Sequence, residues 1–334
     1  MDSTIIADED GSGIHYSSEL ERVRSAFWRD TPEERRLALM PFFWSTLAKN
    51  GIVLGNKEKG SRVLVKNNQL FSAPGYVEIL TGRPWPEVVS NDLIRYKHPT
   101  VLQFVQQELG LDWTEVASIG GWEGYNLLAS SVENAFFTNG GYERVPAEYS
   151  TPRMDELANL QDQIMTLWPE TRSDAVTFGI ALEYLKKHHP RLLYLALGES
   201  DDWSHARRYD RLLDYIHVFD GYLKQLWEFL QASDRYRGRT TLVLTTDHGR
   251  GIKPEDWVGH GEGIAGAEDI WIAVIGPDTP RRGEMELYPD VFQSDVAATV
   301  AAFFGLDYSK QDSEAGPPIP LAFSIEPGAG AGSP

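Results

Sequence analysis

Residues 240–251 read TTLVLTTDHGRG, and this stretch decides the predicted fold. A short run of threonine, leucine and valine is typical of a buried β-strand. The run ends in Asp247 and His248, which are followed by Gly249, Arg250 and Gly251. Open α/β sheets hold their ligands at the carboxyl ends of their strands. Because aspartate and histidine are both metal ligands, the stretch predicts a strand that leads into a metal site.

Around this stretch, predicted strands and helices alternate along the chain. The helix from Thr31 begins with a capping box completed by Glu34, is interrupted at Pro41 and stops at Gly51. Further helices are predicted over 73–82, 173–190 and 294–305, and strands over 61–67, 191–198, 240–246 and 269–276. The alternation predicts an α/β three-layer sandwich, with a mostly parallel central sheet and helices on both faces.

The predicted organisation is a single α/β domain over residues 19–325. Residues 110–170 are rich in tryptophan, asparagine, glycine and proline, and we interpret them as an inserted cap region. The two ends, 1–18 and 326–334, are expected to be weakly ordered, because the first is polar and the second is rich in proline and glycine.

Composition excludes several classes of protein. The formal net charge of −18 argues against nucleic-acid binding, which needs clustered lysine and arginine. The absence of cysteine excludes disulfides and thiolate catalysis. No apolar run reaches transmembrane length, and residues 1–13 do not resemble a signal peptide. The chain as given is expected to be cytoplasmic, or exported if the native start lies upstream; its oligomeric state is left open.

Three further motifs supply candidate partners for Asp247 and His248. Asp201 and His205 are four residues apart, so on a helix they lie on one side and can hold one cation. His260 lies in the glycine-flanked stretch WVGHGEG. Ser72 stands at the predicted start of a helix, where backbone N–H groups and the helix dipole favour an anion.

Together these motifs resemble the alkaline phosphatase superfamily of phosphatases, nucleotide phosphodiesterases, sulfatases and phosphoglycerate mutases. The resemblance rests on Ser72-Ala-Pro followed by Leu80-Thr-Gly, then Asp201-x-x-x-His205, Asp247-His248-Gly and His260, in that order over about residues 60–305. It implies that Asp201, His205 and His260 hold one divalent metal and that Asp247 and His248 hold a second. Ser72 is implied as the nucleophile. Zinc is the expected metal and manganese the alternative; Arg250 is our candidate for stabilising phosphoryl charge.

The chain departs from the family pattern at three places. The first strand of the family ends in a metal-binding aspartate, whereas here only STIIADEDG precedes the first helices. Asp8 or Asp10 could serve in its place, but we expect instead that the native first strand is missing. Gly75 stands where phosphodiesterase relatives carry an asparagine, which favours a phosphomonoester substrate. Tyr76 replaces an arginine that sulfatases need, which disfavours a sulfatase.

The sequence thus predicts a metal-dependent hydrolase that acts on a small-molecule phosphate ester through Ser72, with a monoester favoured over a diester. One alternative is a phosphomutase, which returns the phosphate to its substrate. The other is a catalytically weak or inactive relative that binds a phosphorylated or anionic ligand.

Overall fold

A computed structural model describes residues 17–324 of the protein. It divides into two compact units, which are described separately below. Of the described residues, the first unit comprises 17–70, Ser200–Val291 and 320–324, and the second comprises Phe71–Glu199 and Phe292–Ile319. The two ends that the sequence predicts to be weakly ordered, 1–18 and 326–334, lie outside the described residues except for residues 17 and 18. Asp8 and Asp10 also lie outside them. Within residues 17–324, no helix combines the length and apolar character needed to cross a membrane.

The main sheet of the first unit has four strands in the order β6-β8-β1-β9. Strand β8 runs antiparallel to both of its neighbours, β6 and β1, while β1 and β9 are parallel. Every residue of β8 and β1 is buried, as expected for apolar central strands. The bounds are β1 Ile52–Leu54, β6 Leu242–Thr245, β8 Ile272–Ile275 and β9 Gly283–Glu284. A second sheet has the order β10-β2-β7, with β10 Tyr288–Phe292, β2 Ser61–Leu64 and β7 Asp269–Ile270.

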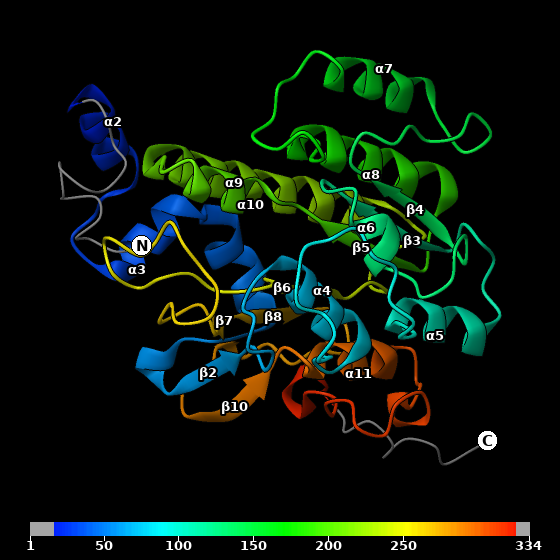
Figure 1. Cartoon of the computed structure of the whole chain (residues 1–334). Helices are drawn as coiled ribbons and strands as arrows, with labels where there is room; N and C mark the ends of the chain where they lie inside the picture. Colours follow the sequence, from blue (N-terminus) through cyan, green and yellow to red (C-terminus); the bar gives the residue numbers. More distant parts are fainter. Residues whose placement is uncertain (1–16, 325–334) are drawn as a thin grey trace. The chain divides into compact units, whose positions relative to one another are not determined.

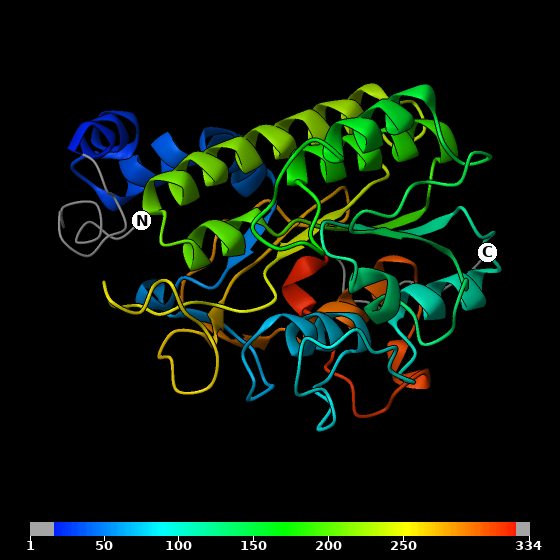
Figure 2. The same cartoon turned by 45° about the horizontal axis from the view of Figure 1, so that its top comes forward.

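Helices of the first unit bury one face of the four-stranded sheet. The long helix α10 (Tyr209–Ala232), yellow-green in Figure 2, and the π-helical turn η1 (Phe43–Leu47) pack on it. Leu47 and Leu223 meet Val53 and Ala273 of the sheet in one core cluster. The other helical segments of this unit are α2 (Ser17–Phe27), α3 (Pro32–Leu39), η2 (Ala48–Asn50), η3 (Lys57–Lys59), η5 (Pro320–Ala322) and most of α9 (Glu199–His205).

The helix predicted from Thr31 forms as its sequence dictates. Thr31 accepts a hydrogen bond from the backbone N–H of Glu34, and the Glu34 side chain accepts one from the backbone of Thr31. The capping box is therefore confirmed. The helix ends at Leu39, just before Pro41, and the chain continues as a π-helical turn from Phe43. The predicted interruption at the proline is also confirmed.

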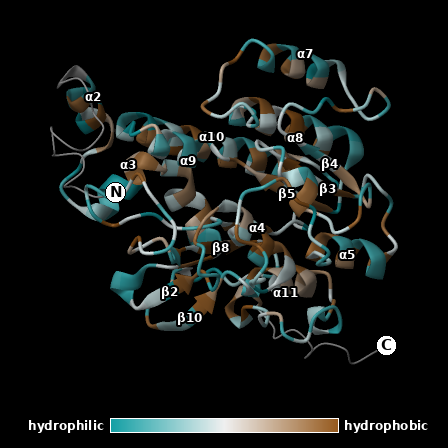
Figure 3. Ribbon diagram, in the orientation of Figure 1, coloured by the Kyte–Doolittle hydropathy of each residue, from teal (hydrophilic) through white to brown (hydrophobic). Residues whose placement is uncertain are grey.

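The second unit is built on a three-stranded sheet, β4-β3-β5, in which all strands are parallel. Helix α8 packs on one face and carries α7 on its outer side (Figure 1), and their apolar side chains meet Ile119 and Phe137 of the sheet. Both helices carry brown and teal residues in Figure 3. The bounds are β3 Val116–Gly120, β4 Phe137–Gly140, β5 Leu192–Ala196, α7 Pro152–Gln161 and α8 Asp174–His188.

The remaining helices of the second unit form a separate cluster. Phe104 and Val105 of α5 (Val101–Leu109) pack against Ala297 and Ala301 of α11 (Asp295–Phe303). Helix α4 (Ser72–Thr81) ends at Gly82, whose φ of 82° is the left-handed conformation that glycine adopts without strain. The short segments α6 (Tyr125–Leu128) and η4 (Tyr308–Lys310) complete this unit.

The α/β class is confirmed, but the predicted strand arrangement needs correction. Among the sheets formed by residues 17–324, only β4-β3-β5 is parallel throughout, whereas β8 is antiparallel to both of its neighbours. The predicted strand 269–276 is divided at Trp271 into β7 and β8, which belong to different sheets. A short apolar strand has the same sequence pattern whichever way it runs, so the sequence cannot reveal its direction. Residues 110–170, predicted as a cap, contribute β3 and β4 of the parallel sheet.

Candidate active site

Two segments of the first unit bring the predicted ligands together. Strand β6 ends at Thr245, two residues before Asp247, and helix α9 carries Asp201 and His205 on successive turns. Gly249 then has to be glycine, because an added Cβ would lie 2.3 Å from the carbonyl oxygens of Gly266 and Asp269. This close approach fixes the chain directly after His248. The loop that follows returns to the site with His260.

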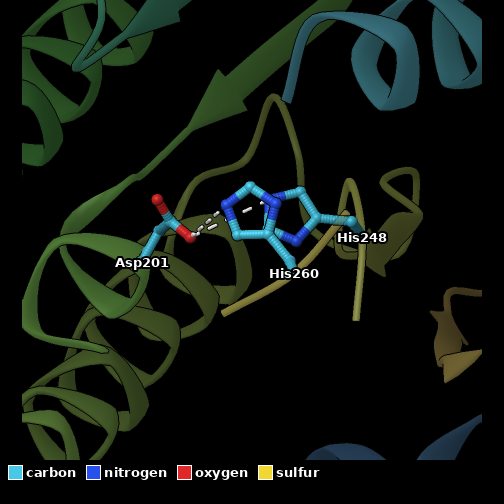
Figure 4. A group of neighbouring side chains, drawn as sticks. All are labelled: Asp201, His248 and His260. Carbon is cyan, nitrogen blue, oxygen red and sulfur yellow. Dashed lines mark ion pairs between the residues drawn. The ribbon is translucent and has the colours of Figure 1, made fainter. Parts of the chain in front are cut away.

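Three imidazoles surround the carboxylate of Asp201. His205 Nε2 lies 3.1 Å from Asp201 Oδ2, and the Nε2 atoms of His248 and His260 each lie 3.8 Å from Oδ1. His205 Nε2 and His260 Nε2 are 3.0 Å apart. The rings of His248 and His260 are stacked with their centroids 4.0 Å apart. Figure 4 shows the polar ends of Asp201, His248 and His260 turned toward one another.

This donor set fits a metal ion. Asp201, His248 and His260 each offer one ligand atom, and these atoms lie within 4.8 Å of one another. His248 Nε2 is buried and makes no hydrogen bond within the described residues. A buried imidazole nitrogen without a hydrogen-bond partner is destabilising unless another group satisfies it. Imidazole and carboxylate ligands without thiolate are typical of zinc. Manganese is the alternative, because it also accepts carboxylate ligands.

The protonation of the cluster suits ligation. Burial alone would raise the pKa of Asp201, but the hydrogen bond from His205 and the charge of Arg250 outweigh it and bring this pKa well below its ordinary range. Burial lowers the pKa of His260 to about 4, and the neighbouring His248 lowers it further against the opposing effect of Asp201. At neutral pH the site therefore presents a carboxylate and a neutral imidazole, the forms that bind a metal.

The structure does not keep the two predicted ligand sets apart. His248, which the resemblance groups with Asp247, lies with Asp201 and His260 instead. Asp247 borders this group through an Oδ2 atom 3.4 Å from His248 Nε2. The assignment of one metal to each set stays a prediction.

Arg250 is held within the same cluster. Its Nη2 atom pairs with the Asp201 carboxylate and lies 3.2 Å from the Asp201 carbonyl oxygen, while Nη1 donates to the carbonyl of Val258 at 2.8 Å. The guanidinium thus contacts a candidate metal ligand, and its predicted action on a phosphoryl group stays a prediction.

Ser72 belongs to the second unit, where it is the first residue of α4. The next residue, Ala73, donates its backbone N–H to the side-chain oxygen of Asn91 at 2.9 Å. The amide group of Asn91 is therefore fixed beside the start of the helix. Sequence analysis did not single out Asn91, because nothing in the stretch VVSNDL marks one polar side chain over its neighbours.

No family model and no curated protein matches the sequence. Solved structures do resemble it. Alkaline phosphatase PafA has a TM-score of 0.56 at 11% identity, over 84% of this chain and 93% of that chain. Murine ectonucleotide pyrophosphatase/phosphodiesterase 5 has a TM-score of 0.51 at 14% identity, over 81% and 91%. The phosphonate monoester hydrolase of Silicibacter pomeroyi has a TM-score of 0.51 at 12% identity, over 87% and 73%. The chain therefore has the fold of the alkaline phosphatase superfamily, as its motifs predict.

Proposed function

We propose that this chain, which has the fold of the alkaline phosphatase superfamily, is a metal-dependent phosphate-ester hydrolase with Ser72 as its nucleophile. The observation that carries the proposal is the cluster of three imidazoles around Asp201, in which the buried His248 Nε2 makes no hydrogen bond within the described residues. Such a cluster serves no evident packing role and is suited to hold a cation. The similar solved structures include a phosphatase, a phosphonate monoester hydrolase and a protein named as a phosphodiesterase.

The proposed ligands are Asp201, His205, His248 and His260, with Asp247 available to a second ion beside His248. Zinc is the preferred metal and manganese the alternative. When bound, divalent ions stabilise the charge on the attacking and leaving oxygens of a phosphoryl transfer. The pairing of Arg250 with the Asp201 carboxylate gives the guanidinium a second role, since it holds the carboxylate in place within the cluster.

Ser72 is suited to its role by its place at the amino end of a ten-residue helix. Helix N–H groups and the helix dipole favour an anion at this end. With its side-chain oxygen engaged by the Ala73 N–H, Asn91 keeps its amide N–H groups available to a phosphate oxygen. Ser72 Oγ loses its proton and forms the new bond to phosphorus as the ester oxygen leaves with the bonding electrons and takes up a proton from solvent. A water oxygen then bonds to phosphorus, the bond from phosphorus to Oγ breaks, and Oγ recovers a proton as phosphate is released.

The proposal is tested with p-nitrophenyl phosphate, bis-p-nitrophenyl phosphate and p-nitrophenyl sulfate, each with added zinc or manganese. We expect turnover to be fastest on the phosphomonoester and to be abolished by Ser72→Ala. Thr151→Ala is the matched control, because it removes a hydroxyl that caps the start of another helix, α7. Hydrolysis that survives in Ser72→Ala at the wild-type rate overturns the role of this serine.

One observation favours a second candidate function. Arg250 pairs with the carboxylate that a metal would need, so the cluster is also compatible with a metal-free protein that binds a phosphorylated or anionic ligand. Elemental analysis of the purified protein separates the two functions. About one or more metal ions per chain supports the hydrolase. A metal-free chain that binds inorganic phosphate in calorimetry, without turnover, supports the second function.

A further inference from the structure

Two carboxylates in the second unit cap each other's helices. Asp174 is the first residue of α8, and Glu199 is the first residue of α9. The two oxygens of Asp174 accept hydrogen bonds from the backbone N–H groups of Gly198 and Glu199, at 3.0 and 2.8 Å. In return, Glu199 Oε1 accepts from the Ser173 hydroxyl and the Asp174 backbone N–H, at 3.0 and 2.8 Å. Each side chain thus satisfies N–H groups at the start of the other helix.

The Asp174 side of this double cap is deeply buried and closely surrounded. Asp174 is 1% exposed, and the neighbouring Arg172 is 3% exposed. The Arg172 guanidinium donates to Thr177, Asn139 and the Gly120 carbonyl, so its position is fixed as well. A Cβ added to Gly121 would lie 3.2 Å from Asp174 Oδ1, which leaves the carboxylate little room to move. The double cap is therefore a rigid support rather than a surface contact.

The supported helix is the one that carries two of the proposed metal ligands. Helix α9 has only seven residues, too few for an isolated helix to be stable in water. Asp201 follows Glu199 by two residues, and His205 lies one further turn along the same helix. The negative charge of the Asp174 carboxylate also interacts favourably with the positive end of the α9 helix dipole. These hydrogen bonds fix the backbone of the first residue of α9.

We propose that Asp174 and Glu199 are positioning residues that hold α9 in the conformation required for metal binding by Asp201 and His205. The inference rests on the proposed metal site. Neither residue belongs to the proposed ligand set. Groups that orient metal ligands from outside the coordination shell typically change metal affinity about 10- to 100-fold when they are removed.

The experiment compares Asp174→Asn and Asp174→Ala with a matched control elsewhere in the chain. Asp220 is 3% exposed and accepts hydrogen bonds from two consecutive backbone N–H groups, those of Phe42 and Phe43, at 2.8 and 2.7 Å. Asp220→Asn therefore perturbs the same kind of buried cap away from α9. Zinc affinity is measured by competition with a chromophoric chelator at a temperature at which circular dichroism shows every variant folded. Hydrogen exchange of residues 198–206 is followed in the metal-free proteins.

We expect Asp174→Asn to weaken zinc binding about 10-fold and Asp174→Ala to weaken it more, since asparagine keeps one acceptor oxygen. Exchange in α9 should become faster in both. Asp220→Asn should lower the melting temperature while zinc affinity and α9 exchange stay as in the wild type. If the Asp174 variants do not fold, Glu199→Gln tests the same cap from its less buried side.

Unchanged zinc affinity in the Asp174 variants of a protein that binds zinc overturns the positioning role alone. An equal loss of affinity in Asp220→Asn also overturns it, because the effect would then follow general stability. A wild-type protein that binds no metal overturns the proposed function together with this inference.

Discussion

His205 Nε2 and His260 Nε2 lie 3.0 Å apart, although the two residues are 55 positions apart in the sequence. Two imidazole nitrogens at this distance either share one proton or direct their lone pairs toward one cation. The low pKa of His260, caused mainly by its burial, disfavours a second proton on this pair at neutral pH. The contact thus links α9 to the loop after β6, and replacing His260 should change the affinity of the site for zinc.

His260→Ala should weaken zinc binding at least 100-fold, because a ligand contributes more than the surrounding groups whose loss costs about 10- to 100-fold. His189→Asn is the control: His189 has a φ of 51°, a left-handed conformation that asparagine tolerates, and it lies at the end of α8. Competition with a chromophoric chelator measures both affinities. Equal zinc affinities in His260→Ala and His189→Asn would exclude His260 as a ligand.

Zinc should stabilise the folded protein and its removal by a chelator should reverse the effect. A free zinc concentration 100 times the dissociation constant adds about 2.7 kcal/mol to the free energy of unfolding. His248→Ala should lose most of this gain, since His248 Nε2 is the buried nitrogen that a metal would satisfy. Thermal unfolding with and without chelator measures the shift. An identical zinc-induced shift in His248→Ala would contradict the ligand assignment.

Two capping boxes at sites of different burial should respond differently to the same change. Thr31→Ala, at an exposed cap, should lower the free energy of unfolding by about 1 kcal/mol. Thr100 is 1% exposed, and its hydroxyl also donates to the Ala129 carbonyl at 2.7 Å. Thr100→Ala should therefore cost more, about 2 kcal/mol or above, because it leaves a buried acceptor without its donor. Urea unfolding compares the two; equal losses would show that burial of the cap has no effect.

Glu143→Gln should stabilise the protein at neutral pH. Glu143 is an exposed residue, and partial desolvation of its carboxylate raises its pKa, although the hydrogen bond from Asn126 and the charge of Arg172 oppose this effect. The gain in stability should therefore be small. A raised folded-state pKa means that the folded protein binds the proton more tightly than the unfolded chain, so stability is lost as pH rises through that pKa. Glutamine keeps an acceptor for the Asn126 amide, which donates to Glu143 at 2.9 Å.

The stability difference between Glu143→Gln and the wild type should therefore shrink below pH 4.5, the ordinary pKa of a glutamate, where both side chains are neutral. Urea unfolding at neutral and acidic pH measures this difference. Glu156→Gln, which removes a carboxylate that pairs with Arg153 at a second exposed position, serves as the control. A difference that is constant with pH would mean that Glu143 is not the group responsible.

The ends and interruptions of helices could be predicted from the sequence where a proline or a glycine restricts the backbone to few conformations. Pro41 interrupts the first predicted helix and Gly82 ends α4, because the proline ring and the left-handed φ leave few alternatives. The resemblance of the motifs to a known family grouped Asp201 and His205 with His260, and the structure brings these three side chains together with His248. Their separate roles as ligands remain predictions.

Other features depend on contacts between distant residues, which a sequence does not display. The contact of Asn91 with Ala73 joins a loop to a helix start, and no local pattern marks it. The pairing of Arg250 with Asp201 likewise joins the segment after β6 to α9, and no local pattern marks it. Strands β7 and β8 form one apolar run in the sequence and are separated only because their pairing partners, β2 and β1, belong to different sheets.

The pairing of β1 with β8 also determines when the first unit can fold during synthesis. Ile52 lies opposite Val274, so roughly 220 residues must be added after β1 before its partner exists. At a synthesis rate of about 5–20 residues per second, β1 waits roughly 10–45 s. During this interval the apolar residues of β1 have no strand to cover them on the ribosome. The nascent chain should therefore depend on chaperones more than a protein of equal length whose neighbouring strands follow one another.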